Sequence, residues 1–208
     1  MNFSISSDVS DDLIIPILNL IHDSFREHFD RGLQFTCSNY QISDIKNKIT
    51  GDGNKCFIAI NDKGELIGIS SVRINKDNKS AYECITAISP SAKGLGIGTA
   101  LYEARKKYLI QMGCEYMLSD TSVDAVSSVN WHKKRCKCSI IGYRSFARTN
   151  YYSYVFREDF VDVGWFKKNI GYKFIFIKSF IITRIFYKKD GTQRHVYHIL
   201  HTIRNIWK

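Results

Sequence analysis

The spacing of apolar residues predicts two helices at the start of the chain. In residues 11–29 the apolar positions recur every three or four residues, which is typical of an amphipathic helix. The expected buried face of this helix consists of Leu13, Ile14, Ile17, Leu18, Ile21 and Phe25. Pro16 is compatible with the helix because it falls near the first turn. A shorter helix is expected over residues 39–49.

The middle of the chain alternates between strand-like and helical patterns. Residues 56–60 and 66–74 are apolar and β-branched and flank the turn sequence Asn-Asp-Lys-Gly, which predicts a β-hairpin. Further strands are expected over residues 80–89, 115–121, 139–146 and 152–156. Helices are expected over residues 99–112 and 123–134. This order of elements predicts an α/β fold in which a mixed sheet carries helices on both faces.

Two features of the sequence support the helix expected over residues 99–112: the spacing of its apolar residues and a stop signal at its end. Gly113 directly follows the segment and marks its end. Its apolar residues are Leu101, Ala104, Tyr108 and Met112.

A glycine-rich loop joins the strand at 80–89 to this helix. Three of the five residues 94–98 are glycine, so the backbone N–H groups there lack side-chain cover. Open N–H groups at the start of a helix, with the positive end of the helix dipole behind them, form a site for an anion such as a diphosphate. A helix-capping turn is the alternative explanation for these glycines.

The spacing of the glycines excludes two common phosphate-binding motifs. A dinucleotide-binding fingerprint needs G-x-G-x-x-G, and a P-loop needs G-K-[ST]; neither pattern is present. The loop instead resembles motif A of the GNAT superfamily of acyl-CoA-dependent N-acyltransferases, [QR]-x-x-G-x-[GA]. The matching residues are Lys93, Gly96 and Gly98, with Pro90 where the family often has a proline. Lys93 departs from the usual Arg or Gln but keeps a cation at that position.

The resemblance implies a fold, a cofactor and a reaction. It implies a GNAT domain over residues 1–160, with a largely antiparallel, twisted mixed sheet flanked by helices. It also implies an N-acetyltransferase that moves an acetyl group from acetyl-CoA to a primary amine. A non-catalytic CoA-binding module that acts as a scaffold or sensor is the alternative function.

The resemblance assigns the cofactor-binding residues to three places. The strand before the loop would pair with the pantetheine arm through Ala87, Ile88 and Ser89. The loop would hold the diphosphate with Lys93, Gly94, Leu95, Gly96, Ile97, Gly98 and Thr99. A third set matches positions that follow the fifth strand in the family, and it comprises Asp124, Ser127 and Trp131.

The catalytic assignments carry open alternatives. Glu83 lies on the strand before the loop, where several relatives place the general base; a structural ion pair with Arg73 across the hairpin is the alternative. Trp131 stands where relatives have the tyrosine that protonates the leaving thiolate, and an indole has no acidic proton to give. His132 and Tyr143 are the remaining candidate acids. Packing for Trp131 and a surface position for His132 are the alternatives.

The amine acceptor is expected near the connection between the first two helices, although nothing there identifies it. The polar and aromatic residues of this connection are His28, Asp30, Arg31, Gln34 and Tyr40.

Composition sets the expected compartment and size. The 208 residues can form one main core. The six cysteines lack paired C-x-x-C spacing, which favours reduced thiols of a cytoplasmic protein over disulfides or zinc. The N-terminal residues lack the pattern of a signal peptide. We therefore expect no metal site and a cytoplasmic location.

The positive charge is concentrated at the end of the chain. The net charge is +10, and residues 165–208 carry ten Lys or Arg and one acid, which gives +9. Residues 161–208 are therefore expected to be a basic, aromatic extension of the domain. The apolar run 174–187 is too short and too charged to span a membrane.

Several roles for this extension stay open. Extra strands and a helix could pack on the domain or form a homodimer contact, and we favour packing. The functional alternative is docking on an anionic membrane surface, at the inner face of the membrane. Nucleic acid binding is disfavoured because no base-stacking motif accompanies the charge. Residues 193–208 predict an amphipathic helix with His195, His198 and His201 on one side, and a solvated helix is favoured there over a metal site.

Overall fold

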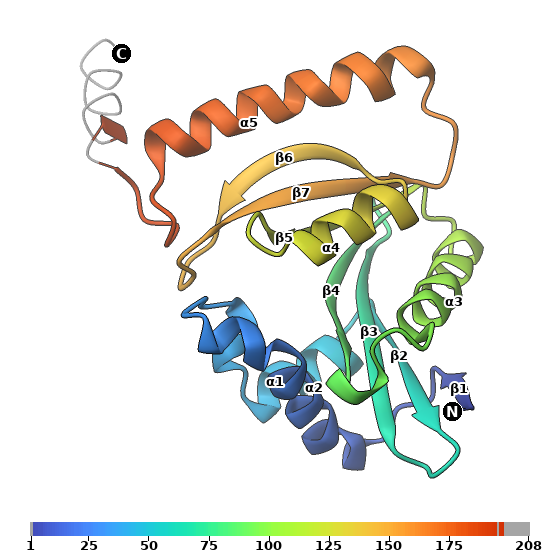
Figure 1. The fold of residues 1–208 in the computed structure, drawn as a ribbon. Helices are drawn as coiled ribbons and strands as arrows, with labels where there is room; N and C mark the ends of the chain where they lie inside the picture. The colour runs from blue at the N-terminus through green and yellow to red at the C-terminus, as the bar shows by residue number, and fades with distance from the viewer. Residues whose placement is uncertain (1, 195, 198–208) are drawn as a thin grey trace. The chain divides into compact units, whose positions relative to one another are not determined.

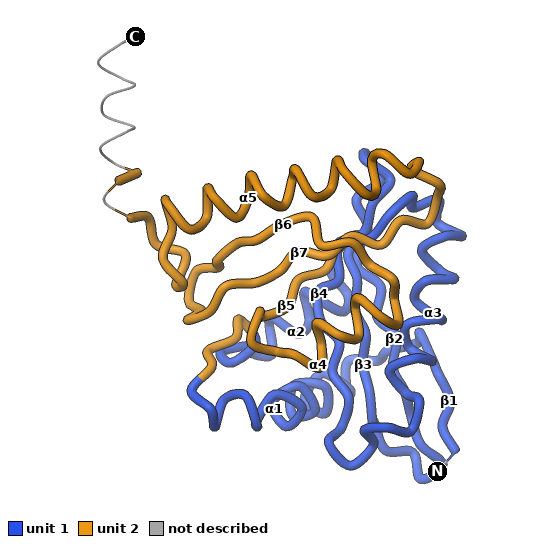
Figure 2. The backbone as a smooth tube through the Cα atoms, turned by 45° about the horizontal axis from the view of Figure 1, so that its top comes forward, with its two compact units in different colours: residues 1–32, 37–118 blue, residues 33–36, 119–208 orange. Residues whose placement is uncertain are grey.

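A computed structural model describes residues 2–194 and 196–197. The chain divides into two compact units, shown in two colours in Figure 2. The first unit comprises residues 1–32 and 37–118, and the second comprises residues 33–36 and 119–208. Hydrogen bonds link seven strands in the order β1-β2-β3-β4-β5-β7-β6, with β5 continuing from the first unit into the second. The predicted mixed, largely antiparallel sheet is confirmed.

Four antiparallel strands and the start of a fifth build the first unit. They are β1 (Phe3–Ser6), β2 (Asn54–Asn61), β3 (Leu66–Asn75), β4 (Ser80–Ile88) and β5 (Tyr116–Ser122). The predicted hairpin is β2–β3, and its turn places Gly64 at φ +79° while the Asn61 side chain accepts hydrogen bonds from the Lys63 and Glu65 amides. Strand β5 pairs in parallel with the first residues of β4. Strand β1 was not predicted, because four residues of mixed polarity give no periodic signal.

Three helices cover the strands of the first unit. They are α1 (Ile14–Asp30), α2 (Ile42–Thr50) and α3 (Ile97–Gln111). Figure 1 shows α1 and α2 on one side of these strands and α3 on the other. A 3₁₀ turn at Asp11–Leu13 precedes α1, so Pro16 falls in the first turn as expected. The core beneath α3 joins residues of β2, β3, the loop and the helix: Phe57, Ala59, Ile67, Ala92, Ile97 and Leu101.

The apolar residues of the predicted helix are not all buried in α3. Leu101 and Leu109 are fully buried, whereas Met112 is 46% exposed. Arg105 also lies on the buried face, with only 3% of its surface exposed. The helix ends at Gln111, and Gly113 adopts the positive φ expected of a helix stop.

The second unit contains a hairpin and two helices. The hairpin is β6 (Ser139–Ser145) with β7 (Tyr152–Asp159), and the helices are α4 (Val126–Asn130) and α5 (Tyr172–Phe186). Helix α4 continues into a π turn at Trp131–Arg135, so the helix predicted over 123–134 starts later and changes its pitch. Helix α5 lies along β6 (Figure 1) and follows a π turn at Lys167–Gly171.

The apolar run 174–187, which was predicted to be too short for a membrane span, forms most of helix α5. No helix in the described part of the chain is long and apolar enough to cross a bilayer. The amphipathic helix predicted over 193–208, including His195, His198 and His201, lies almost entirely outside the described residues. The domain boundary predicted at residue 160 stays a prediction; in the structure β6, β7 and α5 share the second unit.

Candidate functional site

Strand β4 leads into the glycine loop and then into α3. A 3₁₀ turn at Pro90–Ala92 follows the strand, and Gly96 forms the N-cap of α3. Gly94 and Gly96 have φ angles of +83° and +82°, a conformation that side-chain-bearing residues rarely adopt. The chain therefore needs glycine at both positions to turn from the strand into the helix. The strand–loop–helix arrangement expected from the sequence is confirmed.

The loop exposes a row of backbone N–H groups. Among the hydrogen bonds of the described residues, none satisfies the amides of Gly94, Gly96, Ile97, Gly98 or Thr99. A Cβ atom built on any of the three glycines would meet nothing within 4 Å. The protein's own packing therefore does not fill the space above the loop. This space, the open amides and the positive end of the α3 dipole fit an anionic diphosphate group.

The end of β4 borders this loop. Its ladder with β5 covers Ser80–Tyr82, whereas its ladder with β3 continues to Ile88. Ser89 donates its amide hydrogen to the Ile67 carbonyl of β3 at 2.9 Å, so the Ile88 carbonyl of the same peptide points away from β3. Ala87 is buried and Ile88 is half-buried. Of the three strand residues assigned by resemblance, Ile88 therefore presents its carbonyl at the strand edge.

Ser24 of α1 contacts this strand edge, and sequence reasoning missed it. Its hydroxyl oxygen lies 2.8 Å from the Ile88 carbonyl oxygen and 2.6 Å from the Leu20 carbonyl oxygen. A hydroxyl has one hydrogen, so Ser24 donates to one carbonyl at a time. The side chain can therefore leave Ile88 for the helix carbonyl without losing its hydrogen bond. A serine within an amphipathic helix gives no sequence signal for such a contact.

Glu83 forms a buried ion pair with Arg105. Its Oε1 lies 3.0 Å from Nη1 of Arg105 and accepts a 2.5 Å hydrogen bond from Thr86, with 13% and 4% of the two charged side chains exposed. The same guanidinium donates to the Ser70 hydroxyl at 2.9 Å. The expected alternative partner, Arg73, lies opposite Tyr82 in the β3–β4 ladder, and its side chain therefore lies on the other face of the sheet. An arginine on the apolar face of a predicted helix is the signal that could have identified Arg105.

His28 lies in the last turn of α1, one turn after Ser24. Burial lowers the pKa of His28 from its ordinary value of 6.5; the charges of Arg31 and Lys93 lower it further, and Glu27 opposes them. His28 is therefore mainly neutral at pH 7 and can accept a proton.

The structure does not bring the other residues expected around the acceptor together in one element or one unit. Asp30 ends α1 and Arg31 follows it, both exposed. Gln34 belongs to the second unit, where its amide donates to the Asn150 side chain. Tyr40 lies before α2 with the Lys48 ammonium 4.9 Å from its ring centre.

The second unit holds the remaining cofactor-binding candidates. Asp124 is exposed just before α4, and Ser127 is exposed in the first turn of that helix. Trp131 is half-buried at the start of the π turn. Ser127 and Trp131 thus lie on one helical segment, whereas Asp124 lies in the turn before it, because α4 starts later than predicted.

His132 and Tyr143 are both packed within the second unit. His132 stacks on Phe156 with ring centres 4.6 Å apart, and its Nδ1 lies 2.8 Å from the Ser128 carbonyl oxygen. The surface position considered for His132 is therefore wrong, because the π turn directs this ring toward β7. Tyr143 packs 4.9 Å from the Phe180 ring of α5, and burial raises the pKa of its phenol.

The described residues contain no cluster of three His, Cys, Asp or Glu that could hold a metal ion. The six cysteines, all within this part of the chain, are thiols. Burial raises the pKa of Cys37 and Cys56 to about 12, so neither thiol is ionised at neutral pH.

Comparison with solved structures shows what the fold resembles. The ribosomal-protein-S18-alanine N-acetyltransferase from Escherichia coli aligns with a TM-score of 0.62 at 12% identity, over 78% of this chain and 97% of that one. The PaiA N-acetyltransferase from Thermoplasma acidophilum, in complex with coenzyme A, aligns with a TM-score of 0.60 at 12% identity, over 77% of this chain and 100% of that one. A GNAT acetyltransferase from Staphylococcus aureus Mu50 aligns with a TM-score of 0.60 at 12% identity, over 77% of this chain and 100% of that one. At such identities these likenesses show the fold alone.

Comparison of the sequence with protein families identifies the family directly. No curated protein matches the chain in a sequence search. The family described as "Acetyltransferase (GNAT) family" matches residues 15–137, more than half of the chain. The matched segment runs from α1 through the glycine loop to the π turn after α4. The chain therefore belongs to the GNAT family of acetyltransferases.

Proposed function

We propose that this acetyltransferase moves an acetyl group from acetyl-CoA to a primary amine by direct attack of the amine on the thioester. The observation that carries the proposal is the glycine loop at 93–99, which leaves five backbone amides open where the chain enters α3. Acetyl-CoA, when bound, supplies an acyl group activated as a thioester. The protein's task is then to hold that group, orient the amine and manage one proton.

The proposed cofactor site extends from the loop along β4. The amides of Gly94, Gly96, Ile97, Gly98 and Thr99 would bind the diphosphate, with the Lys93 ammonium beside them. The edge of β4 at Ile88 would pair with the pantetheine arm after the Ser24 hydroxyl turns to the Leu20 carbonyl. Asp124, Ser127 and Trp131 belong to the second unit, and their part in cofactor binding is proposed from the family resemblance alone.

Two residues of the first unit can take the proton of the amine. Glu83 has the right chemistry, but its Oε1 already contacts the Arg105 guanidinium and the Thr86 hydroxyl, which supports a structural role for it. His28 is neutral at pH 7 and half-buried, and it lies at the end of α1 where the acceptor is expected. We therefore place His28 ahead of Glu83 as the proton acceptor.

The leaving thiolate needs a proton in return. Tyr143 and His132 stay candidates by position, but both rings are packed in the core of the second unit, which supports a structural role for each. No separate acid is needed if the thiolate receives the one proton that the attacking amine loses, returned to it by the base that first accepted it. Loss of the family's tyrosine at Trp131 is compatible with this route.

The six unpaired thiols support a reducing compartment, and we propose a cytoplasmic location. The acceptor stays at the level of a primary amine, since no residue of the α1–α2 region distinguishes among amines.

The proposal is tested by turnover of acetyl-CoA with a panel of amines, measured as release of the free CoA thiol. We expect release above the hydrolysis background with at least one polyamine, amino sugar or peptide N-terminus, and an acetylated product of matching mass. Tight binding of acetyl-CoA with no release on any amine would favour the scaffold or sensor instead.

A further inference from the structure

Helix α5 exposes more apolar surface than any other helix among the described residues. Of the seventeen large apolar residues that are exposed in the described part of the chain, nine fall within residues 165–185. Seven of them are on α5 itself: Phe174, Ile175, Ile177, Phe180, Ile181, Ile182 and Ile185. Trp165 and Phe166, just before the π turn, are 72% and 68% exposed. Contiguous apolar surface of this kind marks an interaction site.

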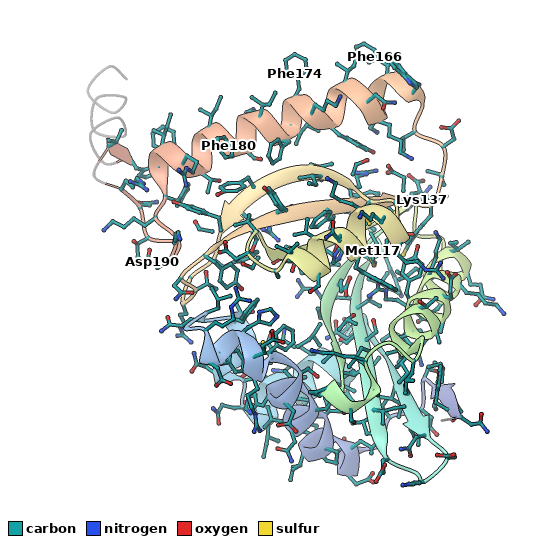
Figure 3. The ribbon with its side chains drawn as sticks, viewed as in Figure 1. Met117, Lys137, Phe166, Phe174, Phe180 and Asp190 are labelled. Atoms are coloured by element: carbon teal, nitrogen blue, oxygen red, sulfur yellow. The ribbon has the colours of Figure 1, made fainter. Side chains whose placement is uncertain are left out.

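The two faces of α5 are clearly separated. The inward face binds the hairpin: Tyr172 donates to Asp159, Thr183 donates to the Tyr143 carbonyl, and Phe176 packs 6.2 Å from the Tyr154 ring. At 100° per residue, Phe174 and Ile181 point the opposite way. Figure 3 shows Phe174 and Phe166 directed away from the strands and Phe180 directed toward them. The helix is thus held by one face and apolar on the other.

Positive charge surrounds the exposed face. Residues 163–189 contain seven Lys or Arg and no acid. All seven are exposed: Lys167, Lys168, Lys173, Lys178, Arg184, Lys188 and Lys189. Lys178 lies within the outward face, and the others flank it along the helix or at its ends. A second copy seated face to face would bring these charges together without a single acid to match them.

We propose that the outward face of α5, together with Trp165 and Phe166, docks on an anionic lipid bilayer, with the helix lying in the plane of the interface. An apolar stripe with aromatic residues and flanking lysines is the composition of interfacial helices. The lysine stems cover apolar surface while their ammonium groups reach the lipid headgroups. Fifteen residues are sufficient for this arrangement and too few to cross the bilayer.

The docking is tested by flotation of the full chain with vesicles of phosphatidylcholine alone or with 30% phosphatidylglycerol. We expect binding to the anionic vesicles at 0.1 M salt and its loss at 1 M salt, because the Debye length falls from ~10 Å to ~3 Å. Binding that is absent at low salt, or equal on neutral vesicles, would overturn the proposal.

Paired variants locate the docking face. Phe174→Ser with Ile181→Ser should reduce vesicle binding roughly tenfold or more, whereas Ile15→Ser with Ile42→Ser, at exposed positions of the first unit, should leave it unchanged. Lys178→Glu should weaken vesicle binding about fivefold or more. Lys107→Glu, at an exposed position of α3, makes the same change of net charge and should have little effect.

Two results would contradict the docking of this face on lipid. Equal losses for both members of a pair would show that net charge or unfolding, and not this face, controls binding. A lipid-free dimer in sedimentation velocity that Phe174→Ser with Ile181→Ser dissociates would assign the face to a second copy. Circular dichroism of each variant checks that the helices are intact.

Discussion

The buried ion pair between Glu83 and Arg105 makes the two residues energetically dependent. Removing one partner leaves the other charge buried without compensation, which costs about 3–5 kcal/mol. We therefore expect Arg105→Met to lower the free energy of unfolding by about that amount in urea titration. The double variant Glu83→Gln/Arg105→Met should recover most of the loss, because both charges are then gone.

An exposed ion pair provides the control for this measurement. Lys79 and Glu115 lie 3.0 Å apart with about half of each side chain or more in solvent. Lys79→Met should change the free energy of unfolding by at most about 1 kcal/mol. A similar small effect for Arg105→Met would mean that the Glu83–Arg105 contact does not stabilise the fold.

The pH dependence of turnover distinguishes His28 from Glu83 as the base. Because burial lowers the pKa of His28, kcat/KM should rise with pH along a limb centred below pH 6.5 as the imidazole loses its proton. His28→Gln should lower kcat and remove this limb, while Kd for CoA stays nearly unchanged. If the limb persists in His28→Gln and disappears in Glu83→Gln, the base is Glu83.

At the scale of elements, α5 protects the edge of the sheet. Strand β6 is the last in the order, and edge strands present unpaired backbone groups. Here the Tyr143 amide donates to the Ser179 hydroxyl at 2.9 Å, and the Tyr143 carbonyl accepts from the Thr183 hydroxyl at 2.7 Å. Two hydroxyls of the helix thus replace the missing neighbouring strand.

Thr183→Val should destabilise the protein because it leaves the Tyr143 carbonyl buried without a donor. The expected loss is about 1–3 kcal/mol in the free energy of unfolding. Thr50→Val is the matched control, because the Thr50 hydroxyl donates to the Lys46 carbonyl at an exposed site. This variant should have little effect on the free energy of unfolding. Equal values for the two variants would show that the Thr183 contact adds nothing.

Periodicity predicted most elements but not the details that depend on partners. The helices at 11–29 and 39–49 and the β2–β3 hairpin follow from local patterns, and the structure has them within a few residues. The burial of Arg105 on α3 was not predicted, because it depends on Glu83 and Ser70, which are distant in sequence. The π turn after α4 was likewise not predicted, because the apolar pattern of residues 123–134 does not distinguish a π turn from an α-helix.

For the whole molecule, the glycine spacing predicted the strand–loop–helix backbone on which the proposed cofactor site is built. Positive φ at Gly94 and Gly96 and an open helix start require little more than the local sequence. Ser24 contacts the end of β4 from another helix, so the sequence alone could not assign this contact. The concentration of positive charge was visible in the sequence, but only the structure shows which face of α5 stays exposed.

The central claim is that the glycine loop holds the diphosphate of the cofactor, and calorimetric titration with CoA tests it most directly. Gly96→Val should weaken CoA binding about a hundredfold or more, because the side chain blocks several charge-assisted hydrogen bonds worth about 1.5–3 kcal/mol each. Gly64→Val is the matched control: its φ of +79° imposes similar strain, with equally open space, away from the loop. The account predicts that Gly64→Val binds CoA like the parent. A folded Gly96→Val protein with the affinity of the parent would contradict it.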